Sequence, residues 1–161
     1  ERIGKGGKPI KILKLRSMVA DAGNVKKYLS PDQLHQWEVE RKVDNDPRIT
    51  KVGRFIRKCS IDEIPQFLNV LNGDLSVIGP RPITRHELEQ HFSNEEKAEL
   101  LSVQPGITGL WQATARNDAT FESGMRQKIE LHYVRNRSFA MDWQCFIGTF
   151  SVMFGNNRTG R

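Results

Sequence analysis

The segment from Ile49 to Pro82 constrains the fold more than any other part of the chain. Its first stretch, "ITKVGRFIRK", repeats apolar residues at helical spacing, and "PQFLNVL" predicts a second helix that "NGD" ends. "LSVIG" then predicts a short buried strand that runs directly into Pro80-Arg81-Pro82. The two prolines fix the backbone on either side of one arginine, so the strand must leave its sheet through a rigid loop.

The elements around this segment are predicted from pattern and turn residues. Residues 2–18 form a β-hairpin around "KGGK", whose glycines supply the positive φ of a tight turn. Ser30 followed by Pro31 starts a helix. Residues 85–102 have a helical pattern, and "QPGITG" is typical of a turn.

Two further helices are expected towards the C-terminus. Residues 120–137 are amphipathic, with an apolar stripe of Phe121, Met125, Ile129 and Tyr133. Residues 139–154 are apolar nearly all round, so this helix belongs either to the core or to a membrane interface. No repeat or internal boundary interrupts the pattern, and the sequence predicts one domain over residues 1–161.

The charge of the chain points to an anionic partner. A net charge of +6 and a pI near 9.6 suit nucleic acid, anionic lipid headgroups or a phosphorylated substrate. No stretch reaches the roughly 18 apolar residues that span a bilayer. Cys59 and Cys145 lack metal-site spacing and are expected as reduced thiols in a cytoplasmic setting. His86 and His91 are five residues apart and do not predict a zinc site.

Asp62 and Glu63 are adjacent carboxylates that allow two interpretations. In the first they only start a helix, either as a capping box of Ser60 with Glu63 or with Asp62 as N-cap and Pro65 in the first turn. In the second, the helix start and nearby cations keep a nucleophilic or metal-binding carboxylate ionised. The two interpretations are compatible with one another.

The basic residues also have two interpretations. The runs around Lys11 and Lys51 could form a solvated face, although almost no acidic residue balances them. Arg81 is more specific, because a guanidinium held between two prolines suits bidentate phosphate binding. The alternative interpretation is that Arg81 only lies in the loop where the strand ends and binds no phosphate.

Three segments together resemble the bacterial sugar transferases, the monotopic phosphoglycosyl transferases that act on polyprenyl phosphate. They are "RIGKGGKPIKILKLRSM", "DPRITKVGRFIRKCSIDEIPQFLNVLNGDLSVIGPRP" and "PGITGLWQ", in the family's order. The resemblance covers residues 2–154. It implies a mostly helical α+β fold, in which a β-hairpin packs with amphipathic helices that lie in the cytoplasmic face of the bacterial inner membrane.

The resemblance also implies a reaction. The family transfers a sugar-1-phosphate from a nucleotide-activated sugar, usually a UDP-sugar, to polyprenyl (undecaprenyl) phosphate with Mg²⁺, and releases UMP. Asp62 matches the nucleophile that forms a covalent phosphosugar intermediate, and Glu63 matches the second carboxylate that assists through metal or proton handling. Arg81 is the leading phosphate-binding candidate. Further substrate-binding candidates are Lys14, Arg16, Arg57 and Arg116.

Some positions depart from the family pattern. Leu15 replaces an aromatic residue, Ala115 replaces a glycine before Arg116, and Glu130 replaces an aspartate. The resemblance further predicts a hydrophobic re-entrant helix upstream of Glu1. Two rival functions remain at this stage: a basic nucleic-acid-binding module, for which no helix-turn-helix or stacking platform is evident, and a membrane-surface scaffold without catalysis.

Overall fold

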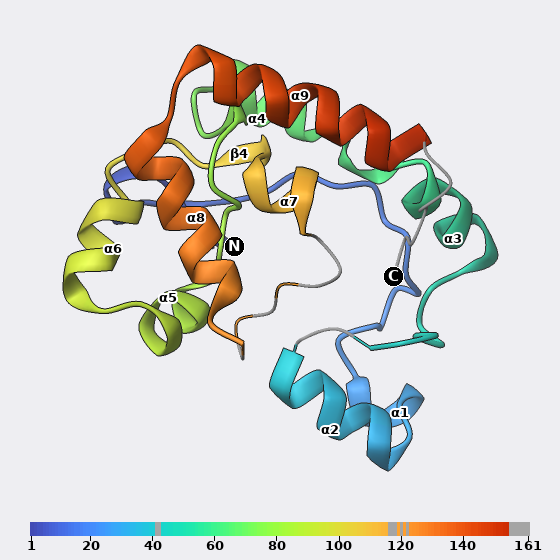
Figure 1. Ribbon diagram of the computed structural model, residues 1–161. Coiled ribbons are helices and arrows are strands. Elements are labelled where there is room, and N and C mark those ends of the chain that lie inside the picture. The colour runs from blue at the N-terminus through green and yellow to red at the C-terminus, as the bar shows by residue number, and fades with distance from the viewer. Residues whose placement is uncertain (41–42, 116–118, 120, 122, 155–161) are drawn as a thin grey trace. The chain divides into compact units, whose positions relative to one another are not determined.

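The computed structural model describes residues 1–40, 43–115, 119, 121 and 123–154. Within these residues the fold is mostly helical and has two sheets of two strands each (Figure 1). The α+β class predicted from the sequence is confirmed. The chain divides into two compact units: a larger unit of residues 1–14 and 63 onward, and a smaller unit of residues 15–62.

The smaller unit is built from short helices with well-defined caps. Ser30 caps its second helix as predicted: the Ser30 hydroxyl accepts a hydrogen bond from the main-chain N–H of Gln33 at 3.3 Å. A buried ion pair of 2.6 Å joins Arg48 to Asp46, and Arg48 also donates to the carbonyl of Ala22 at 3.1 Å. The helices are α1 (Val25–Tyr28), α2 (Pro31–Glu40) and α3 (Lys51–Lys58), followed by a 3₁₀ turn, η2 (Ile61–Glu63), whose last residue belongs to the larger unit.

The larger unit begins with the predicted hairpin, which is shorter than expected. β1 (Arg2–Ile3) pairs antiparallel with β2 (Pro9–Ile10) around the turn η1 (Lys5–Gly7). Gly6 and Gly7 have φ values of 69° and 80°, as the turn requires.

The hairpin ends because the next main-chain groups bond to a side chain instead of a strand. The amide of Leu13 donates to Oδ1 of Asn69 at 3.0 Å, and Nδ2 of Asn69 donates to the carbonyl of Lys11 at 2.8 Å. Asn69 is buried in α4 (Gln66–Leu71), so this helix fixes the path of the chain towards Lys14.

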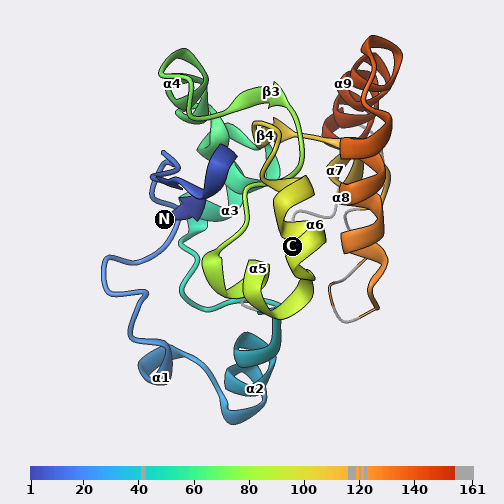
Figure 2. The ribbon, with the colours of Figure 1, turned by 90° about the vertical axis from the view of Figure 1, so that its left-hand side faces the viewer.

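Two capped helices, rather than one helix over residues 85–102, cover the hairpin side of the core. Thr84 and Glu87 form a capping box for α5 (Arg85–His91), and Ser93 and Glu96 form one for α6 (Asn94–Leu100). The second cap restarts the helix at Asn94, so the helical pattern predicted for residues 85–102 is confirmed as two helices. The core cluster joins α5 and α6 to β1 and to the helix Met125–Asn136; Figure 2 shows how these elements are arranged. It consists of Ile3, Ile83, Leu88, Phe92, Leu100 and Leu131.

The second sheet holds the Pro-Arg-Pro loop. β3 (Ser76–Ile78) pairs in parallel with β4 (Gly106–Thr108), where the sequence predicts a turn. Beyond the strands, the amide of Gly106 donates to the carbonyl of Pro80 at 2.9 Å. The strand prediction for residues 75–79 is confirmed, but its burial is wrong, because Val77 is 39% exposed.

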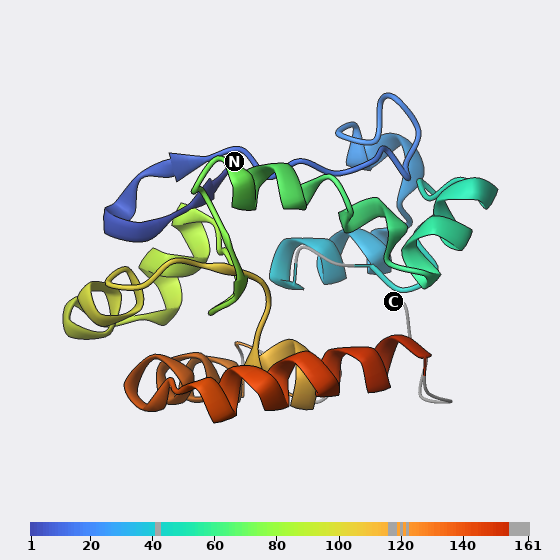
Figure 3. The same ribbon diagram turned by 90° about the horizontal axis from the view of Figure 1, so that it is seen from above.

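The remaining helices are α7 (Leu110–Thr114), α8 (Met125–Asn136) and α9 (Phe139–Phe154). α9 packs along α7 (Figures 1 and 3). The apolar stripe predicted for α8 is wrong in part: Met125 is exposed, Phe121 precedes the helix, and Glu130 is 1% exposed. The helix packs on both α6 and α7, and this arrangement buries a carboxylate that the pattern places among polar residues.

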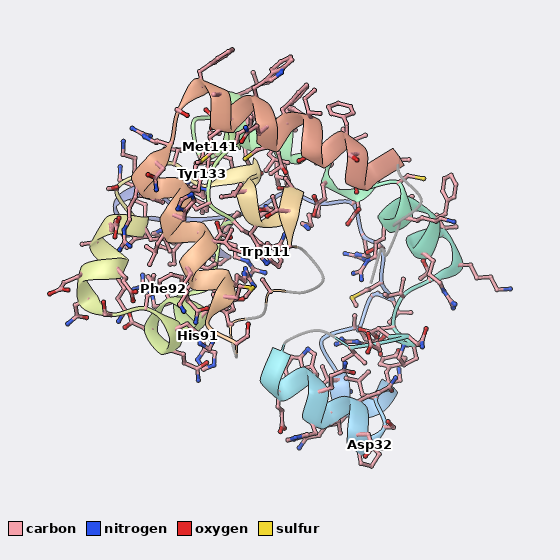
Figure 4. All side chains as sticks on the ribbon, in the orientation of Figure 1. Asp32, His91, Phe92, Trp111, Tyr133 and Met141 are labelled. Carbon is pink, nitrogen blue, oxygen red and sulfur yellow. The ribbon has the colours of Figure 1, made fainter. Side chains whose placement is uncertain are left out.

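One face of the larger unit is apolar and exposed. In Figure 2, α4 and α9 lie at the same end of this unit, with β3 between them. Figure 4 shows aromatic rings that project from α9 away from the unit. The exposed apolar side chains, called the apolar face below, are Ile64, Phe67, Leu68, Leu71, Val77, Phe139, Trp143, Ile147 and Phe150. Among the described residues, none of the helices has the length and apolar character needed to span a bilayer.

Candidate active site

The predicted carboxylate pair lies in η2, ahead of α4 and separate from it. α4 begins at Gln66 with Pro65 as its N-cap and has no side-chain cap, so the interpretation of Asp62 as the N-cap of this helix is wrong. The physical reason is the backbone of Ser60, whose φ of 53° turns the chain out of α3 before a second helix can start. A serine in the left-handed region is uncommon, and such strain is typical of functional sites.

Asp62 is nearly buried. Only 8% of the residue is exposed, and its carbonyl accepts a hydrogen bond from the amide of Leu15 at 3.0 Å. This bond ties the turn to the segment that carries Arg16 and Ser17. The main chain therefore holds Asp62 in a defined position independent of its carboxylate.

Glu63 is paired within the larger unit. Nζ of Lys14 lies 2.7 Å from its Oε1, and the two side chains are 41% and 24% exposed. A pair this exposed contributes little to stability, so its main effect is to orient the Glu63 carboxylate. Lys14 thus lies beside Glu63.

Arg57 is fixed by a residue of the "RSM" segment. Its Nε donates to the buried hydroxyl of Ser17 at 2.7 Å. The main chains also approach closely, because a Cβ at Gly53 would lie 1.8 Å from the Ser17 carbonyl oxygen. Arg16, the residue before Ser17, is exposed. Arg116 lies outside the described residues.

Arg81 lies in a cluster that the sequence interpretation did not find. Its amide donates to Oε2 of Glu130 at 3.2 Å, and its guanidinium carbon lies 5.5 Å from the ring centroid of Trp111. Arg126 lies on the same ring at 4.3 Å, and 3.9 Å from the ring centroid of Phe121. Trp111 comes from α7, Arg126 from the first turn of α8, and Arg81 from the loop after β3.

Burial dominates the electrostatics of this cluster. Desolvation lowers the pKa of the Arg126 guanidinium to about 10, and the positive charge of Arg81 acts in the same direction. Desolvation raises the pKa of Glu130 to about 7, although Arg126 and the Arg81 amide favour its charged form. Burial therefore makes the charged form of each group less favourable than it would be in water, and this desolvation costs folding free energy.

Comparison with known proteins decides the family. The model of the bacterial sugar transferase family matches residues 1–156. The chain belongs to the bacterial sugar transferase family. The resemblance inferred from the three sequence segments is confirmed.

Named relatives of this sugar transferase act on lipid carriers. It is 45% identical over 156 residues to the undecaprenyl-phosphate galactose phosphotransferase of Salmonella typhimurium, an alignment that covers 95% of the chain and 32% of the relative. The chain is 39% identical over 145 residues to the UDP-glucose:undecaprenyl-phosphate glucose-1-phosphate transferase of Escherichia coli K12, and this alignment covers 88% of the chain and 29% of the relative. The exopolysaccharide production protein ExoY of Rhizobium meliloti is 41% identical to the chain over 144 residues, and this alignment covers 88% of the chain and 62% of the relative. The chain therefore spans less than a third of the length of the first two relatives.

The donor set of the sugar transferase fits Mg²⁺. Asp62 and Glu63 supply two carboxylates in one turn, and Mg²⁺ in transferases is usually held by one or two carboxylates together with substrate phosphates. Over the described part of the chain, no group of three or more His, Cys, Asp or Glu side chains is placed to hold a metal. A Mg²⁺ ion held by Asp62 and Glu63 would therefore need further ligands, such as the phosphates of a substrate.

Trp111, Arg126 and Glu130 are the site residues that the sequence interpretation missed. Trp111 was available from the motif "PGITGLWQ", and Glu130 as a departure from the family's aspartate. Arg126 had no such signal, because an arginine on an amphipathic helix reads as a solvated charge.

Proposed function

We propose that this sugar transferase moves a sugar-1-phosphate from a UDP-sugar to undecaprenyl phosphate and releases UMP. The observation that carries the proposal is the position of Asp62: nearly buried, in a strained turn, and followed by a second carboxylate that a lysine orients. The names of the Salmonella and Escherichia relatives support the acceptor class, and the name of the Escherichia relative also supports the donor class. Polysaccharide assembly, as the name of the Rhizobium relative suggests, is the corresponding process.

The proposed reaction has two displacements at one phosphorus atom. A carboxylate oxygen of Asp62 attacks the phosphorus that bears the sugar; an Asp–phosphorus bond forms, and the bond from that phosphorus to the bridging oxygen breaks. UMP leaves with the electron pair. An oxygen of the lipid phosphate then attacks the same phosphorus, and the Asp62 carboxylate is released.

The chain's own residues prepare these steps by position and charge. Lys14 holds Glu63 beside the nucleophile, and Arg81 supplies a guanidinium on a loop that prolines and β4 keep rigid. Mg²⁺, when held by Asp62 or Glu63, would neutralise phosphate charge. Arg57 and Arg16 are proposed as further contacts of the anionic substrates.

The proposal includes a membrane surface. The apolar face of α4, β3 and α9 leaves Phe139 85% exposed, and exposed apolar side chains of this kind suit contact with lipid. An acceptor with a polyprenyl chain would be met at this surface. The side concerned is proposed to be the cytoplasmic face of the inner membrane, where nucleotide sugars are available.

The test uses the full-length protein in nanodiscs with Mg²⁺, undecaprenyl phosphate and a panel of UDP-sugars. We expect UMP release that depends on the lipid and on one sugar, and a loss of at least about a thousandfold in Asp62→Asn. Asp32→Asn, a change of an exposed carboxylate in α2, is the control and should retain activity. A folded Asp62→Asn protein with near-wild-type turnover would refute the proposed nucleophile.

A further inference from the structure

The guanidinium of Arg126 lies against aromatic rings and, within the part of the chain that the structure describes, has no anionic partner in contact. Its carbon lies 4.3 Å from the Trp111 ring centroid and 3.9 Å from that of Phe121, so the side chain lies between two π faces. The ring of His91 stacks on Phe121, with centroids 4.6 Å apart and planes within 3° (Figure 4 labels Trp111 and His91). Aromatic faces attract the cation but accept no in-plane hydrogen bonds from its N–H groups.

The hydrogen-bonding capacity of Arg126 is therefore unused. Its Nε is buried without a hydrogen-bond partner, and so is Oε1 of Glu130. Across the described residues, no carboxylate oxygen lies within the 4.0 Å of an ion pair with Arg126. A buried donor without a partner is costly, and native structures retain such groups mainly where a ligand or water completes them.

The two nearby carboxylates, Glu87 and Glu130, accept hydrogen bonds from other residues. Glu87 caps α5, accepting from the amide and the hydroxyl of Thr84 at 2.7 and 2.8 Å. Glu130 accepts from the amide of Arg81 at 3.2 Å. Among the described residues neither carboxylate forms an ion pair with Arg126, although Oε1 of Glu130 has no hydrogen-bond partner.

Positive charge accumulates at the same place. Arg81 lies on the indole of Trp111 together with Arg126, so the two cations repel each other across one ring. The helix α8 starts at Met125, and its N-cap, Gly124, has no side chain, so the positive end of the helix dipole adds to the field. Two guanidinium groups that repel each other in the absence of a ligand would be stabilised by a doubly charged anion.

We propose that Arg81 and Arg126 together bind the diphosphate group of the nucleotide donor, with the Trp111 ring as their common support. This inference rests on the proposed function for the identity of the ligand. It adds Arg126 as a substrate-binding residue and makes Trp111 and Phe121 positioning residues. Planar guanidinium groups bind phosphate oxygens in bidentate fashion, and the stacked rings hold the Arg126 plane in one orientation.

The test measures binding, not turnover. Inorganic diphosphate is titrated by calorimetry into the full-length protein in detergent, with polyprenyl phosphate in a parallel arm. We expect saturable diphosphate binding that weakens about tenfold to a hundredfold in Arg126→Gln and in Arg81→Gln, and lipid phosphate binding within about twofold of wild type. Arg135→Gln is the matched control, because Arg135 lies on the same helix, is exposed and pairs with Glu99 at 2.7 Å.

Each result has one meaning. No diphosphate binding by wild type, unchanged diphosphate affinity in a folded Arg126→Gln protein, or a loss confined to the lipid arm would overturn the proposal. A purely structural Arg126 would lower the melting temperature but leave diphosphate affinity intact. If Arg126→Gln does not fold, the diphosphate affinities of Arg126→Lys and Arg81→Gln test the proposal instead, because both variants keep Trp111 and Phe121. Failure of wild type to release UMP, with diphosphate binding intact, would count against the proposed function alone.

Discussion

The main-chain amide of Arg81 donates a hydrogen bond of 3.2 Å to a carboxylate oxygen of Glu130, 49 residues further along the chain. The bond links the Pro-Arg-Pro loop to the centre of α8. Since Glu130 is fully buried, its protonation state bears on both the loop and the stability of the fold.

Stability should fall as the pH rises towards neutrality because of Glu130. Its pKa is raised to about 7 in the folded protein, against 4.5 for an ordinary glutamate. The unfolded chain therefore loses this proton at lower pH than the folded chain, and the stabilisation present below pH 4.5 is lost as the pH passes through 7. The difference amounts to roughly 3 kcal/mol.

Glu130→Gln isolates this effect, because the amide oxygen can still accept from Arg81. Urea unfolding at pH 5 and pH 8 should show the variant gaining stability relative to wild type at the higher pH. Glu95→Gln, an exposed change in α6, should follow the wild-type profile. Parallel profiles for Glu130→Gln and wild type would contradict the prediction.

Lys14→Met should separate activity from stability. The Lys14–Glu63 pair is half-exposed, so its loss should cost less than about 1 kcal/mol of unfolding free energy. Activity should fall by about tenfold or more, since Glu63 loses the cation that orients it. Lys97→Met breaks a comparable pair with Glu89, 2.6 Å long, and should leave UMP release unchanged. Equal activity losses in the two variants would indicate a general effect of surface charge.

Gly53→Ala should destabilise the smaller unit. The added Cβ would lie 1.8 Å from the Ser17 carbonyl oxygen, and main-chain atoms cannot yield as a flexible side chain can. We expect a loss of about 2–3 kcal/mol, measured by urea unfolding. Gly23→Ala is the control, because nothing lies within 4 Å of its added Cβ. A Gly53→Ala protein as stable as the control would show that the close approach can relax freely.

The apolar face should govern membrane binding. Replacing both Phe139 and Trp143 with Ser removes two exposed rings from α9 and should weaken vesicle binding by at least about a hundredfold, without lowering the melting temperature. Vesicle sedimentation measures the effect, and Gln144→Ser, on the same helix, serves as the control. Undiminished binding by the double variant would place the lipid contact elsewhere.

Local signals in the sequence predicted local structure well. The cap at Ser30, the glycine turn at Gly6 and the strand before Pro80 depend on neighbouring residues, and the structure has them. The interpretation of Asp62 as a helix N-cap fails because the positive φ of Ser60 is not predicted by any sequence pattern.

Long-range contacts explain the rest of the difference. Arg126, Trp111 and Arg81 meet only after α7, α8 and the strand exit have packed, and no spacing along the chain encodes that meeting. Glu130 is buried where the periodicity of α8 places a polar residue, because tertiary packing overrides the pattern. The charge and motifs indicated an anionic substrate, but not which side chains surround it.

The apolar face also affects the solubility of the protein. A surface with apolar side chains as exposed as Phe139 on α9 and Leu71 on α4 is unfavourable in water at any appreciable concentration. Without lipid or detergent, the protein should associate with itself as it is concentrated, even though its net charge of +6 opposes association. Its solubility limit should therefore fall steeply as salt screens that charge.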